Sequence, residues 1–570
     1  MIFENYNKWL EKAVADNELI EELKSINGNE NEIKDRFYKS LEFGTGGLRG
    51  IIGAGTNRMN IYTVGSATQG LAEYVKSVNE NASVAIAYDS RIKSDLFARH
   101  AATVLAANGV KVYIYPELMP TPMLSFAVRY FKCDAGIVVT ASHNPSKYNG
   151  YKAYGPDGCQ LNLEASEYVL SIINKVDIFD GVKTCDFDEA LKSGKIEYIG
   201  EDCFNAYLDA VQKCSVSDST YKFSDLKVIY TPLHGSGNKP VRAILKRIGV
   251  ENVTVVKEQE LPDGNFPTTP YPNPEIRQAF ECALKLAETI KPDLLLATDP
   301  DSDRVGIAVN QNGEYKLMSG NDVGALLLNY ILERKKSFNT LPKEPFAVKT
   351  IVTTDLAAAI AKNYGCTIVD VLTGFKFIGE QIRLLEEKGE ENRFVFGFEE
   401  SYGYLAGSYV RDKDAVVGSM LVCEMCCYYL NQGKTLIDVL NDLYKKYGYY
   451  YNAQKSITCE GLDGMELMAK SMENLRNNPP TSIAGMKVIN VSDYKTSIST
   501  DTLSNTEKKI TLPKSNVLSY TLEGGSKAIV RPSGTEPKIK IYLLTIGNSF
   551  ENGKDIANKI EDDMTKLLNL

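Results

Sequence analysis

A short apolar run that leads directly into a polar loop occurs three times in this chain, and it restricts the possible folds more than any other feature. The runs cover residues 135–140, 294–298 and 394–398, and the loops that follow begin "ASHNP", "DPDSDR" and "EESYG". Short apolar runs of this kind are typical of interior strands in a parallel sheet. Helical segments such as 95–107 and 239–248 alternate with the strands, which predicts βαβ units. We therefore expect three related α/β units that present polar loops where such sheets bind ligands.

The rest of the chain predicts a helical segment before these units and a smaller domain after them. Its 570 residues exceed one core and predict three to five domains. Apolar residues at helical spacing within 7–26 predict an N-terminal extension packed on the first domain. After about residue 450, alternating segments and a helix at 550–568 predict antiparallel strands in an α+β domain. The expected divisions are 1–40 for the extension, 41–205, 206–320 and 321–450 for the α/β domains, and 451–570 for the α+β domain.

Charge and cysteine content exclude several classes of protein. The net charge of −9 argues against nucleic acid or an anionic membrane as a partner. Apolar runs of 18 residues are absent and the first residues do not resemble a signal peptide, so we expect a cytoplasmic protein without a membrane partner. Eleven scattered cysteines indicate reduced thiols, and Cys423, Cys426 and Cys427 are expected to pack inside a buried helix.

The first polar loop places Ser142 and His143 immediately after an apolar strand. Catalytic groups concentrate in loops held by such a scaffold, and we expect Ser142 to be exposed there. Serine, asparagine and proline are also ordinary turn formers. The residues by themselves therefore leave open a turn that only reverses the chain.

The second loop carries Asp299, Asp301 and Asp303 at alternate positions, and Arg304 ends the run. Three crowded carboxylates each resist ionisation unless a cation neutralises them. Oxygen ligands suit Mg²⁺, which keeps positions open for phosphate oxygens. A solvated acidic turn is the alternative, but the apolar strand that leads into the run favours a magnesium site.

Two later loops offer groups for an anionic sugar. In "GFEESYGYL", Glu399, Glu400 and Ser401 are adjacent acceptors that could bind neighbouring hydroxyls, with a solvated turn as the alternative. In "VRPSGTEPKIKIY", a planar guanidinium, hydroxyls, an ammonium group and backbone amides could hold a phosphate, with a surface β-turn as the alternative. The residues of this phosphate loop are Arg531, Ser533, Gly534, Thr535 and Lys538.

Glycine-rich and histidine-containing segments are less specific. The segment "EFGTGGLRG" presents Arg49 but has neither P-loop nor dinucleotide-binding spacing. His100 lies in the predicted helix 95–107 and is expected to be structural. His143 and His234 both lie in loops after strands, where a direct role and a hydrogen-bonding role remain open.

Together the loops resemble the α-D-phosphohexomutase superfamily, whose signature elements occur here in the family's order. They are "TASHNP", "DPDSDR", "GFEES" and "RPSGTEP", and the resemblance spans roughly residues 41–545. It implies an α/β fold of three related domains with mixed, mainly parallel sheets plus a C-terminal α+β domain, arranged around a central cleft. It also implies a phosphoserine at Ser142, Mg²⁺ on Ser142 and the three aspartates, sugar recognition by the third loop, and phosphate binding by the fourth.

The resemblance further assigns roles to individual residues. Lys152 and Arg49 are expected to assist proton transfer and to stabilise charge near the nucleophile, and Lys413 matches a family lysine near the sugar. Together with Ser142 and His143, these residues are the expected catalytic groups. Residues expected to contact the substrate outside the phosphate loop are Arg304, Thr373, Gly374, Lys376, Glu399, Ser401 and Arg411.

The extended N-terminus and the segments "TPLHGSGNKP" and "TGFKFIGEQIR" resemble the phosphoglucomutase and phosphopentomutase branch. We therefore expect interconversion of glucose 1-phosphate and glucose 6-phosphate through glucose 1,6-bisphosphate, in a monomer or homodimer. Phosphopentomutase and phosphomannomutase activities are alternatives. A sugar-phosphate phosphatase would leave Ser142 without a role, and a non-catalytic sensor would lack one of the chemical residues that are present here.

Overall fold

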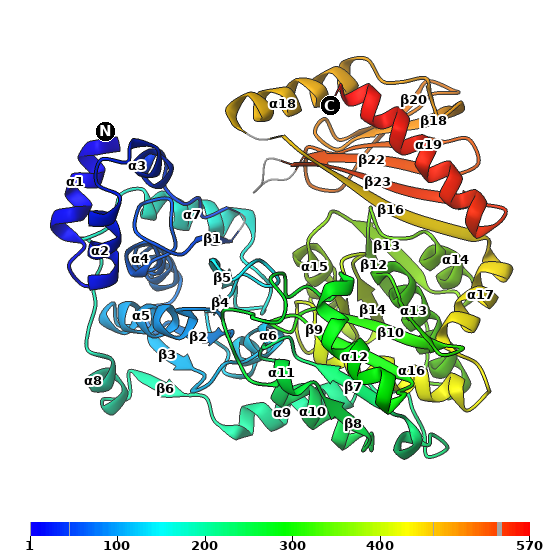
Figure 1. Cartoon of the computed structure of the whole chain (residues 1–570), viewed down its shortest axis with the longest axis horizontal. Coiled ribbons are helices and arrows are strands. Elements are labelled where there is room, and N and C mark those ends of the chain that lie inside the picture. Colours follow the sequence, from blue (N-terminus) through cyan, green and yellow to red (C-terminus); the bar gives the residue numbers. More distant parts are fainter. Residues whose placement is uncertain (1, 45, 460, 533–537, 570) are drawn as a thin grey trace. The chain divides into compact units, whose positions relative to one another are not determined.

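Three sheets in the computed structural model repeat one strand order, as the three apolar runs predict. The structure describes residues 2–44, 46–459, 461–532 and 538–569. In the first sheet the order is β1-β5-β4-β2-β3-β6, and in the second it is β11-β10-β9-β7-β8. The third contains β13-β12-β14 in sequence across the sheet. The strands that lead into the polar loops, β4, β9 and β14, thus hold equivalent places, which confirms three related α/β units (Figure 1).

Contacts divide the chain into two compact units. One consists of residues 1–318, 378–394 and 401–433, and the other of residues 319–377, 395–400 and 434–570. The central cleft that the family resemblance implies stays a prediction, and so do the boundaries of the five expected domains.

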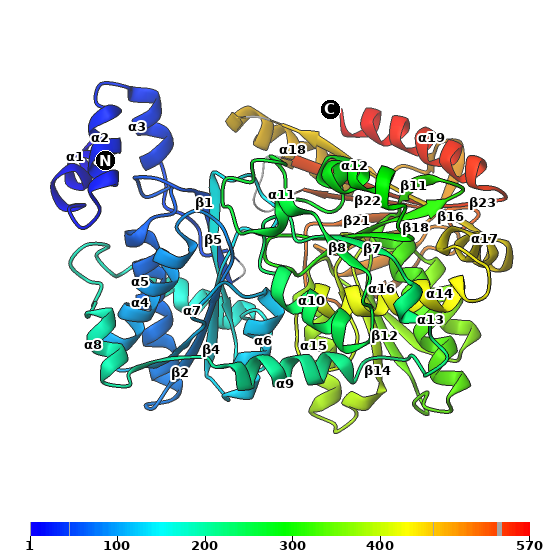
Figure 2. The same cartoon turned by 60° about the horizontal axis from the view of Figure 1, so that its bottom comes forward.

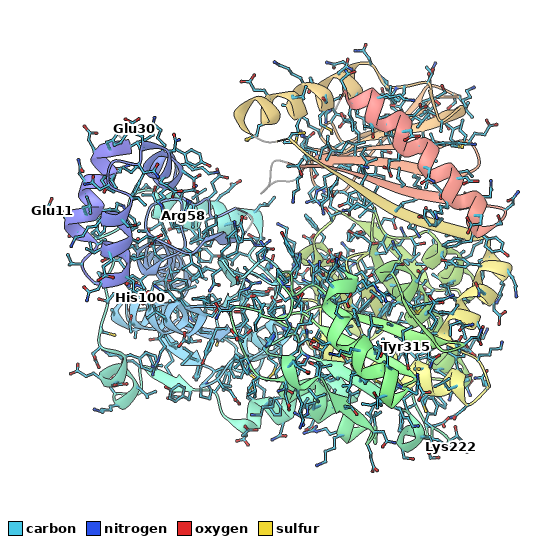
Figure 3. All side chains as sticks on the ribbon, viewed as in Figure 1. Glu11, Glu30, Arg58, His100, Lys222 and Tyr315 are labelled. Carbon is cyan, nitrogen blue, oxygen red and sulfur yellow. The ribbon has the colours of Figure 1, made fainter. Side chains whose placement is uncertain are left out.

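The N-terminal extension consists of three helices, α1 (Ile2–Lys12), α2 (Asn17–Ser25) and α3 (Glu30–Phe37). The helical spacing in 7–26 is interrupted because the Asp16 side chain accepts a hydrogen bond from the Glu18 amide and starts a new helix. Trp9 lies in a core that includes Tyr62 of the first α/β part. Arg58, labelled in Figure 3, pairs with Asp35 of α3. The predicted packing of the extension on the first domain is therefore confirmed.

The first α/β part has a sheet covered by helices on both faces. Parallel pairs join β2 to β3 and β4, and antiparallel pairs join β5 to β4 and β1. Helices α4 and α5 cover one face and α6 covers the other (Figure 2). The elements are β1 (Gly47–Ile51), α4 (Ile61–Val78), β2 (Ser83–Tyr88), α5 (Ser94–Ala107), β3 (Lys111–Ile114), α6 (Thr121–Tyr130), β4 (Ala135–Val139), β5 (Tyr148–Tyr154), α7 (Leu163–Ile173), α8 (Phe187–Lys192), β6 (Ile196–Tyr198) and α9 (Glu201–Gln212).

The second α/β part follows the same plan. Its strand β7 pairs in parallel with β8 and β9, and β10 returns antiparallel to β9. The elements are η1 (Phe223–Asp225), β7 (Val228–Thr231), α10 (Asn238–Arg247), β8 (Val253–Val255), α11 (Lys257–Glu260), η2 (Arg277–Phe280), α12 (Glu281–Ile290), β9 (Leu294–Thr298), β10 (Val305–Gln311) and β11 (Glu314–Leu317).

The third α/β part includes a fully buried helix. Helix α16 contains Cys423, Cys426 and Cys427, all buried, which confirms their role as core residues. No helix among the described residues is both long and apolar enough to cross a membrane. The elements are α13 (Gly320–Ser337), β12 (Phe346–Thr350), α14 (Leu356–Asn363), β13 (Thr367–Val371), α15 (Phe375–Glu386), η3 (Glu391–Arg393), β14 (Phe394–Phe398), β15 (Tyr404–Leu405), α16 (Ala415–Leu430) and α17 (Leu436–Tyr447).

The C-terminal part is an antiparallel sheet with apolar residues on both faces. Its order is β16-β23-β22-β21-β18-β19-β20, with β17 beside β18. Helices α18 and α19 cover one face through a core that contains Met472, Ile560 and Val530. On the other face, Ile529 and Tyr542 belong to a hydrophobic cluster that includes residues of the third α/β part. These residues are Ile351, Val352 and Leu372. The elements are β16 (Tyr449–Thr458), α18 (Gly461–Asn477), β17 (Ser482–Ile483), β18 (Met486–Asp493), β19 (Ile498–Asp501), β20 (Thr506–Lys509), β21 (Leu518–Leu522), β22 (Lys527–Pro532), β23 (Lys538–Gly547) and α19 (Phe550–Leu568).

Candidate active site

The loop after β4 brings Ser142 to the acidic loop after β9. Ser142 Oγ donates a hydrogen bond of 2.8 Å to Asp299 Oδ2 and lies 3.2 Å from His143 Nδ1. The expectation of an exposed serine is wrong, because the residue is only 4% exposed and its hydroxyl turns towards the carboxylate. Its backbone has φ of 51°, a left-handed conformation that a residue other than glycine rarely adopts. Strain of this kind at a loop is frequent at functional sites.

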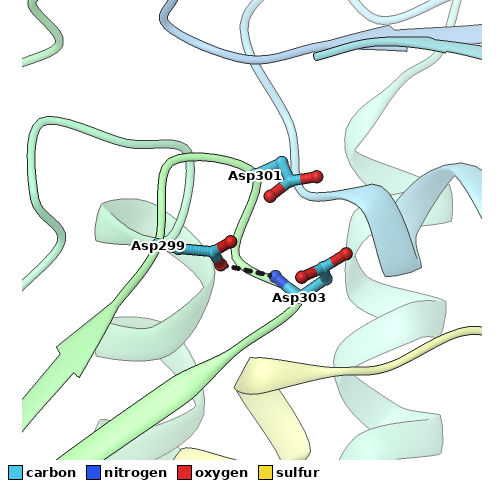
Figure 4. A group of neighbouring side chains, drawn as sticks. All are labelled: Asp299, Asp301 and Asp303. Carbon is cyan, nitrogen blue, oxygen red and sulfur yellow. Dashed lines mark hydrogen bonds between the residues drawn. The ribbon is translucent and has the colours of Figure 1, made fainter. Parts of the chain in front are cut away.

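The three aspartates form one buried cluster at the end of β9 (Figure 4). Asp299, Asp301 and Asp303 are at most 1% exposed, and one oxygen of each lies within 4.8 Å of the others. The backbone of the turn stabilises this arrangement, since Asp299 Oδ1 accepts hydrogen bonds from the amides of Asp303 and Arg304. The alternation of aspartates along the chain thus places their carboxylates around one point.

The free oxygens of this cluster fit a cation. Lys152 Nζ lies 3.0 Å from Asp301 Oδ2, and Lys413 Nζ lies 3.0 Å from Asp303 Oδ2. The second oxygens, Asp301 Oδ1 and Asp303 Oδ1, are buried and accept no hydrogen bond from any described residue. Arg304 Nε lies 3.8 Å from Asp303 Oδ1, beyond hydrogen-bond distance. Buried carboxylate oxygens that accept no hydrogen bond are costly, and a hard divalent cation is what such oxygens bind. The donor set therefore fits the magnesium ion that the sequence predicts.

Electrostatics in the cluster also favour a bound cation. Burial and the neighbouring charges of Asp301 and Asp303 raise the pKa of Asp299 well above its usual value. Burial alone would also raise the pKa of Asp301. The positive charge of Lys152 and the hydrogen bond with Asp299 outweigh burial, and the pKa of Asp301 lies below its usual value. A divalent ion would relieve this mutual repulsion and allow all three groups to ionise.

His143 is neutral in this environment. Its pKa lies well below the usual value because the surrounding protein desolvates the ring and Arg304 and Arg49 add positive charge. Arg49 lies on β1, whose partner β5 carries Lys152. Arg304 Nη1 forms a 2.6 Å ion pair with Glu275. The structure therefore gathers Arg49, His143, Lys152, Arg304 and Lys413 near Ser142 and the aspartates, all within one compact unit.

Arg411 has a different environment from the one expected for a substrate-binding residue. Its side chain is completely buried, and Nη2 donates 2.7 Å to Glu386 Oε2 while Nη1 donates 3.1 Å to the carbonyl of Val410. These contacts stabilise the loop that carries Lys413. Its contact with substrate stays a prediction.

Most residues expected to bind sugar and phosphate lie in the other compact unit, whereas Arg304, Ser401 and Arg411 belong to the first. Glu399 Oε1 accepts a 3.0 Å hydrogen bond from the amide of Gly374, whose φ of 116° is one that suits glycine. Thr373 and Lys376 flank this glycine on the same segment, and Ser401 is half-buried. Glu400 accepts hydrogen bonds from Thr350 and Thr353.

The phosphate loop is described at its two ends. Arg531 and Lys538 occupy neighbouring strands β22 and β23. Burial raises the pKa of Tyr542 on β23, and Glu400, Arg531 and Glu399 also act on that hydroxyl. The sugar loop and Arg531 are therefore close within this unit. Ser533, Gly534 and Thr535 lie outside the described residues.

Sequence reasoning missed several groups that hold the site. Thr121 Oγ1 donates 2.9 Å to Asp301 Oδ2, and Tyr154 donates 2.6 Å to Asp412, which pairs with Lys413. Arg91 contacts the carbonyl of Ser142. Arg91 lies in a polar loop directly after the apolar strand β2, so the pattern that drew attention to the other loops could also have identified it.

Comparisons with known proteins agree with this geometry. Models of the phosphoglucomutase/phosphomannomutase α/β/α domains I, II and III match residues 40–178, 205–313 and 319–447. The chain is 38% identical to a curated phosphoglucomutase of Staphylococcus epidermidis, covering 98% of this chain and 99% of the relative. It is also 38% identical to that of Staphylococcus haemolyticus, covering 92% and 94%.

Solved structures share the fold. The phosphoglucomutase parafusin from Paramecium, in an open form, has a TM-score of 0.66 at 16% identity and covers 93% of this chain and 96% of its own. A phosphoglucomutase/phosphomannomutase family protein from Burkholderia thailandensis has a TM-score of 0.66 at 17% identity, covering 92% and 97%. The family models and the curated relatives show that the chain belongs to the phosphoglucomutase/phosphomannomutase family.

Proposed function

We propose that this chain is a phosphoglucomutase that interconverts glucose 1-phosphate and glucose 6-phosphate through a phosphoserine at Ser142 and glucose 1,6-bisphosphate. The observation that carries the proposal is the hydrogen bond from Ser142 Oγ to Asp299 within the buried aspartate cluster. The name phosphoglucomutase of relatives that match nearly the full chain supports glucose as the sugar. Phosphomannomutase and phosphopentomutase activities are not favoured.

The cluster explains how a phosphoserine can be held at this place. A phosphoryl group on Ser142 carries about −1.5 to −2 charges and would face carboxylates unless positive charge is present. Lys413 supplies one positive charge to Asp303 Oδ2, and Lys152 Nζ lies beside Asp301 Oδ2. Mg²⁺ on Asp299, Asp301, Asp303 and the Ser142 phosphate would withdraw negative charge during phosphoryl transfer.

The surrounding side chains have separate tasks in the transfer. A sugar hydroxyl attacks the phosphorus of phosphoserine, the bond from phosphorus to Ser142 Oγ breaks, and the hydroxyl proton leaves to a base. We assign the base to Lys152, whose neutral amine form accepts this proton and becomes an ammonium group, and the hydrogen bond from Nζ to Asp301 Oδ2 positions the amine beside the acidic loop. Neutral His143 can accept or donate one hydrogen bond at Ser142 Oγ. Arg49 stabilises charge on the phosphoryl group.

Substrate recognition is assigned to the loops of the other unit and to the remaining predicted residues. Glu399 and Ser401 bind sugar hydroxyls, and the phosphate that is not transferred binds the loop between Arg531 and Lys538. The loop's Ser533, Gly534 and Thr535 take part in this grip. Further contacts are proposed for Arg304, Thr373, Gly374, Lys376 and Arg411.

The first experiment measures phosphate on the protein. Intact-mass analysis after incubation with glucose 1,6-bisphosphate should show one added phosphate on the wild-type chain and none on Ser142→Ala. Ser146→Ala, four residues along the same loop, is the matched control and should keep both phosphate and activity. Removing a nucleophile costs several orders of magnitude in rate. Full activity in Ser142→Ala would refute the assignment.

The second experiment tests the metal and the sugar. Chelation should abolish activity, and Mg²⁺ should restore it. Comparison of kcat/KM for glucose 1-phosphate, mannose 1-phosphate and ribose 1-phosphate tests the substrate, because buried polar groups without partners discriminate strongly against the wrong sugar. A preference for ribose 1-phosphate of more than about tenfold would refute glucose as the substrate.

We further propose a cytoplasmic enzyme that is a monomer or homodimer. Neither membrane nor nucleic acid is expected as a partner. Light scattering after size-exclusion chromatography distinguishes the two oligomeric states.

A further inference from the structure

Arg91 is a buried arginine directed at the backbone of the loop that carries Ser142. Its side chain is 0% exposed. Nη1 donates 3.0 Å hydrogen bonds to the carbonyls of Pro145 and Tyr148, and Nη2 donates to the carbonyls of Ser142 and Asn144. Four carbonyls of one seven-residue segment thus converge on a single guanidinium, whose planar geometry suits several acceptors at once.

A second set of hydrogen bonds fixes the amide side of Ser142. Thr140 Oγ1 accepts a 2.8 Å hydrogen bond from the Ser142 amide and donates 2.6 Å to Asp89 Oδ2. The same carboxylate is fully buried and lies 3.4 Å from Arg91 Nε. Asp89 therefore neutralises Arg91, which binds the carbonyl of Ser142. Through Thr140, the same carboxylate also supports the amide of Ser142. Both backbone groups of Ser142, its amide and its carbonyl, are held in place although its φ is positive.

The guanidinium is covered by a residue from the second α/β part. The Phe266 ring centroid lies 5.1 Å from the central carbon of the Arg91 guanidinium, and Phe266 is 1% exposed. The loop with Phe266 presses closely on the Arg91 loop, because a Cβ at Gly264 would lie 2.4 Å from the Ile92 amide nitrogen. An aromatic face over a desolvated cation is favourable and also excludes water from it.

These contacts distinguish Arg91 from a residue that binds substrate. Its side chain has no exposure to solvent, and both terminal nitrogens are occupied by carbonyls of the nucleophile loop. Any effect of Arg91 on the reaction must therefore pass through the position of Ser142.

We propose that Arg91, paired with Asp89 and covered by Phe266, is the positioning residue that sets Ser142 in its left-handed conformation with Oγ towards Asp299 before substrate binds. This inference rests on the proposed function, because it assigns a task within phosphoryl transfer. Small misplacements of a reacting group reduce rate far more than they reduce ground-state binding. Loss of Arg91 should therefore lower kcat and leave KM nearly unchanged.

The test compares Arg91→Ala with Arg99→Ala. Arg99 is the matched control, since it lies eight residues along the same domain, is exposed, and also covers an aromatic ring, that of Phe187. With glucose 1-phosphate, we expect kcat of Arg91→Ala to fall about 100-fold with KM changed by less than about threefold. Arg99→Ala should match the wild type. Added guanidinium ion, which fits the space left by the side chain, should restore kcat at least about tenfold, and urea should not.

Two further measurements keep the test decisive. Hydrogen exchange of the peptide containing residues 134–154 should increase in Arg91→Ala and not in Arg99→Ala, and this readout does not depend on activity. If Arg91→Ala does not fold, Arg91→Lys replaces it and should show an intermediate loss of kcat with normal KM. Wild-type kcat in either folded variant, or no rescue by guanidinium, would overturn the inference. An inactive wild-type chain would instead refute the proposed function, and the exchange result would still test the positioning of the loop.

Discussion

His100, labelled in Figure 3, provides a quantitative test of the first α/β part. It lies in α5, donates a hydrogen bond to the backbone of Ile61, and packs so closely on α4 that a Cβ at Gly65 would lie 2.9 Å from its Nε2. Desolvation of this ring lowers the pKa of His100 from 6.5 to about 4. The perturbation is His100→Gln, which removes the titrating group and keeps a hydrogen-bond donor.

The sign of the effect follows from proton binding. The pKa of His100 is depressed in the folded chain, so between pH 6.5 and about 4 the unfolded chain binds a proton that the folded chain does not. The free energy of unfolding therefore falls as pH decreases through this range. A difference of about 2.5 between the two pKa values corresponds to about 3 kcal/mol at and below pH 4, and to about 2.5 kcal/mol at pH 4.5.

The only tryptophan of the chain offers a local probe. Trp9 is 2% exposed and lies 5.5 Å from the ring centroid of Tyr62, a residue of the same helix α4 that His100 contacts. Urea unfolding of the wild-type protein and of His100→Gln should be monitored by Trp9 fluorescence at about pH 7 and about pH 4.5. At pH 7 the variant should be about 1 kcal/mol less stable because the replacement hydrogen bond is imperfect.

At pH 4.5 this order should reverse, because only the wild-type protein has lost the additional 2.5 kcal/mol estimated above. Titration of other groups affects both proteins equally and cancels in the comparison. Parallel losses of stability in the two proteins would refute the calculation for His100.

Three further predictions concern packing, phosphate binding and thiols. Gly324→Ala places a Cβ 2.1 Å from the ring of Phe398, the residue before the sugar loop. The substitution should lower the free energy of unfolding by about 2 kcal/mol in a thermal unfolding assay, and an unchanged melting temperature would contradict the close packing. Arg531→Ala should raise KM for glucose 1-phosphate about tenfold and leave phosphorylation of Ser142 intact by mass analysis; an unchanged KM would show that this arginine does not bind phosphate. A thiol reagent should modify at most three cysteines rapidly in the folded chain and all eleven after denaturation, since eight are buried. Rapid modification of more than three cysteines in the folded chain would contradict their burial in the hydrophobic cores. The three partly exposed cysteines are Cys185, Cys214 and Cys282.

The sequence predicts those features of the fold that depend on local pattern. The apolar runs before Ser142, Asp299 and Glu399 are strands β4, β9 and β14, because short apolar segments favour interior strands regardless of what lies far along the chain. The aspartate cluster could be predicted for the same reason, since all three carboxylates belong to one turn. Their alternation is visible without knowledge of any partner.

Features that depend on distant partners could not be predicted in this way. Arg91 lies about fifty residues before the carbonyls that it binds, and nothing in its own segment reveals them. The burial of Ser142 has the same origin, because Asp299, 157 residues away, accepts its hydrogen bond. The break at Asp16 is different, since a capping aspartate is a local signal that apolar periodicity alone does not detect.

The two-faced C-terminal sheet has a consequence for folding during synthesis. Strand β16 starts the sheet, but its partner β23 is nearly a hundred residues later, where Tyr449 pairs with Gly547. Until β23 leaves the ribosome, β16 has no neighbour on the side that β23 occupies, and the apolar residues Ile351 and Val352 lack the cover that Tyr542 provides. Nascent chains and chains truncated before β23 should therefore expose apolar surface and depend on chaperones until the last strand is made.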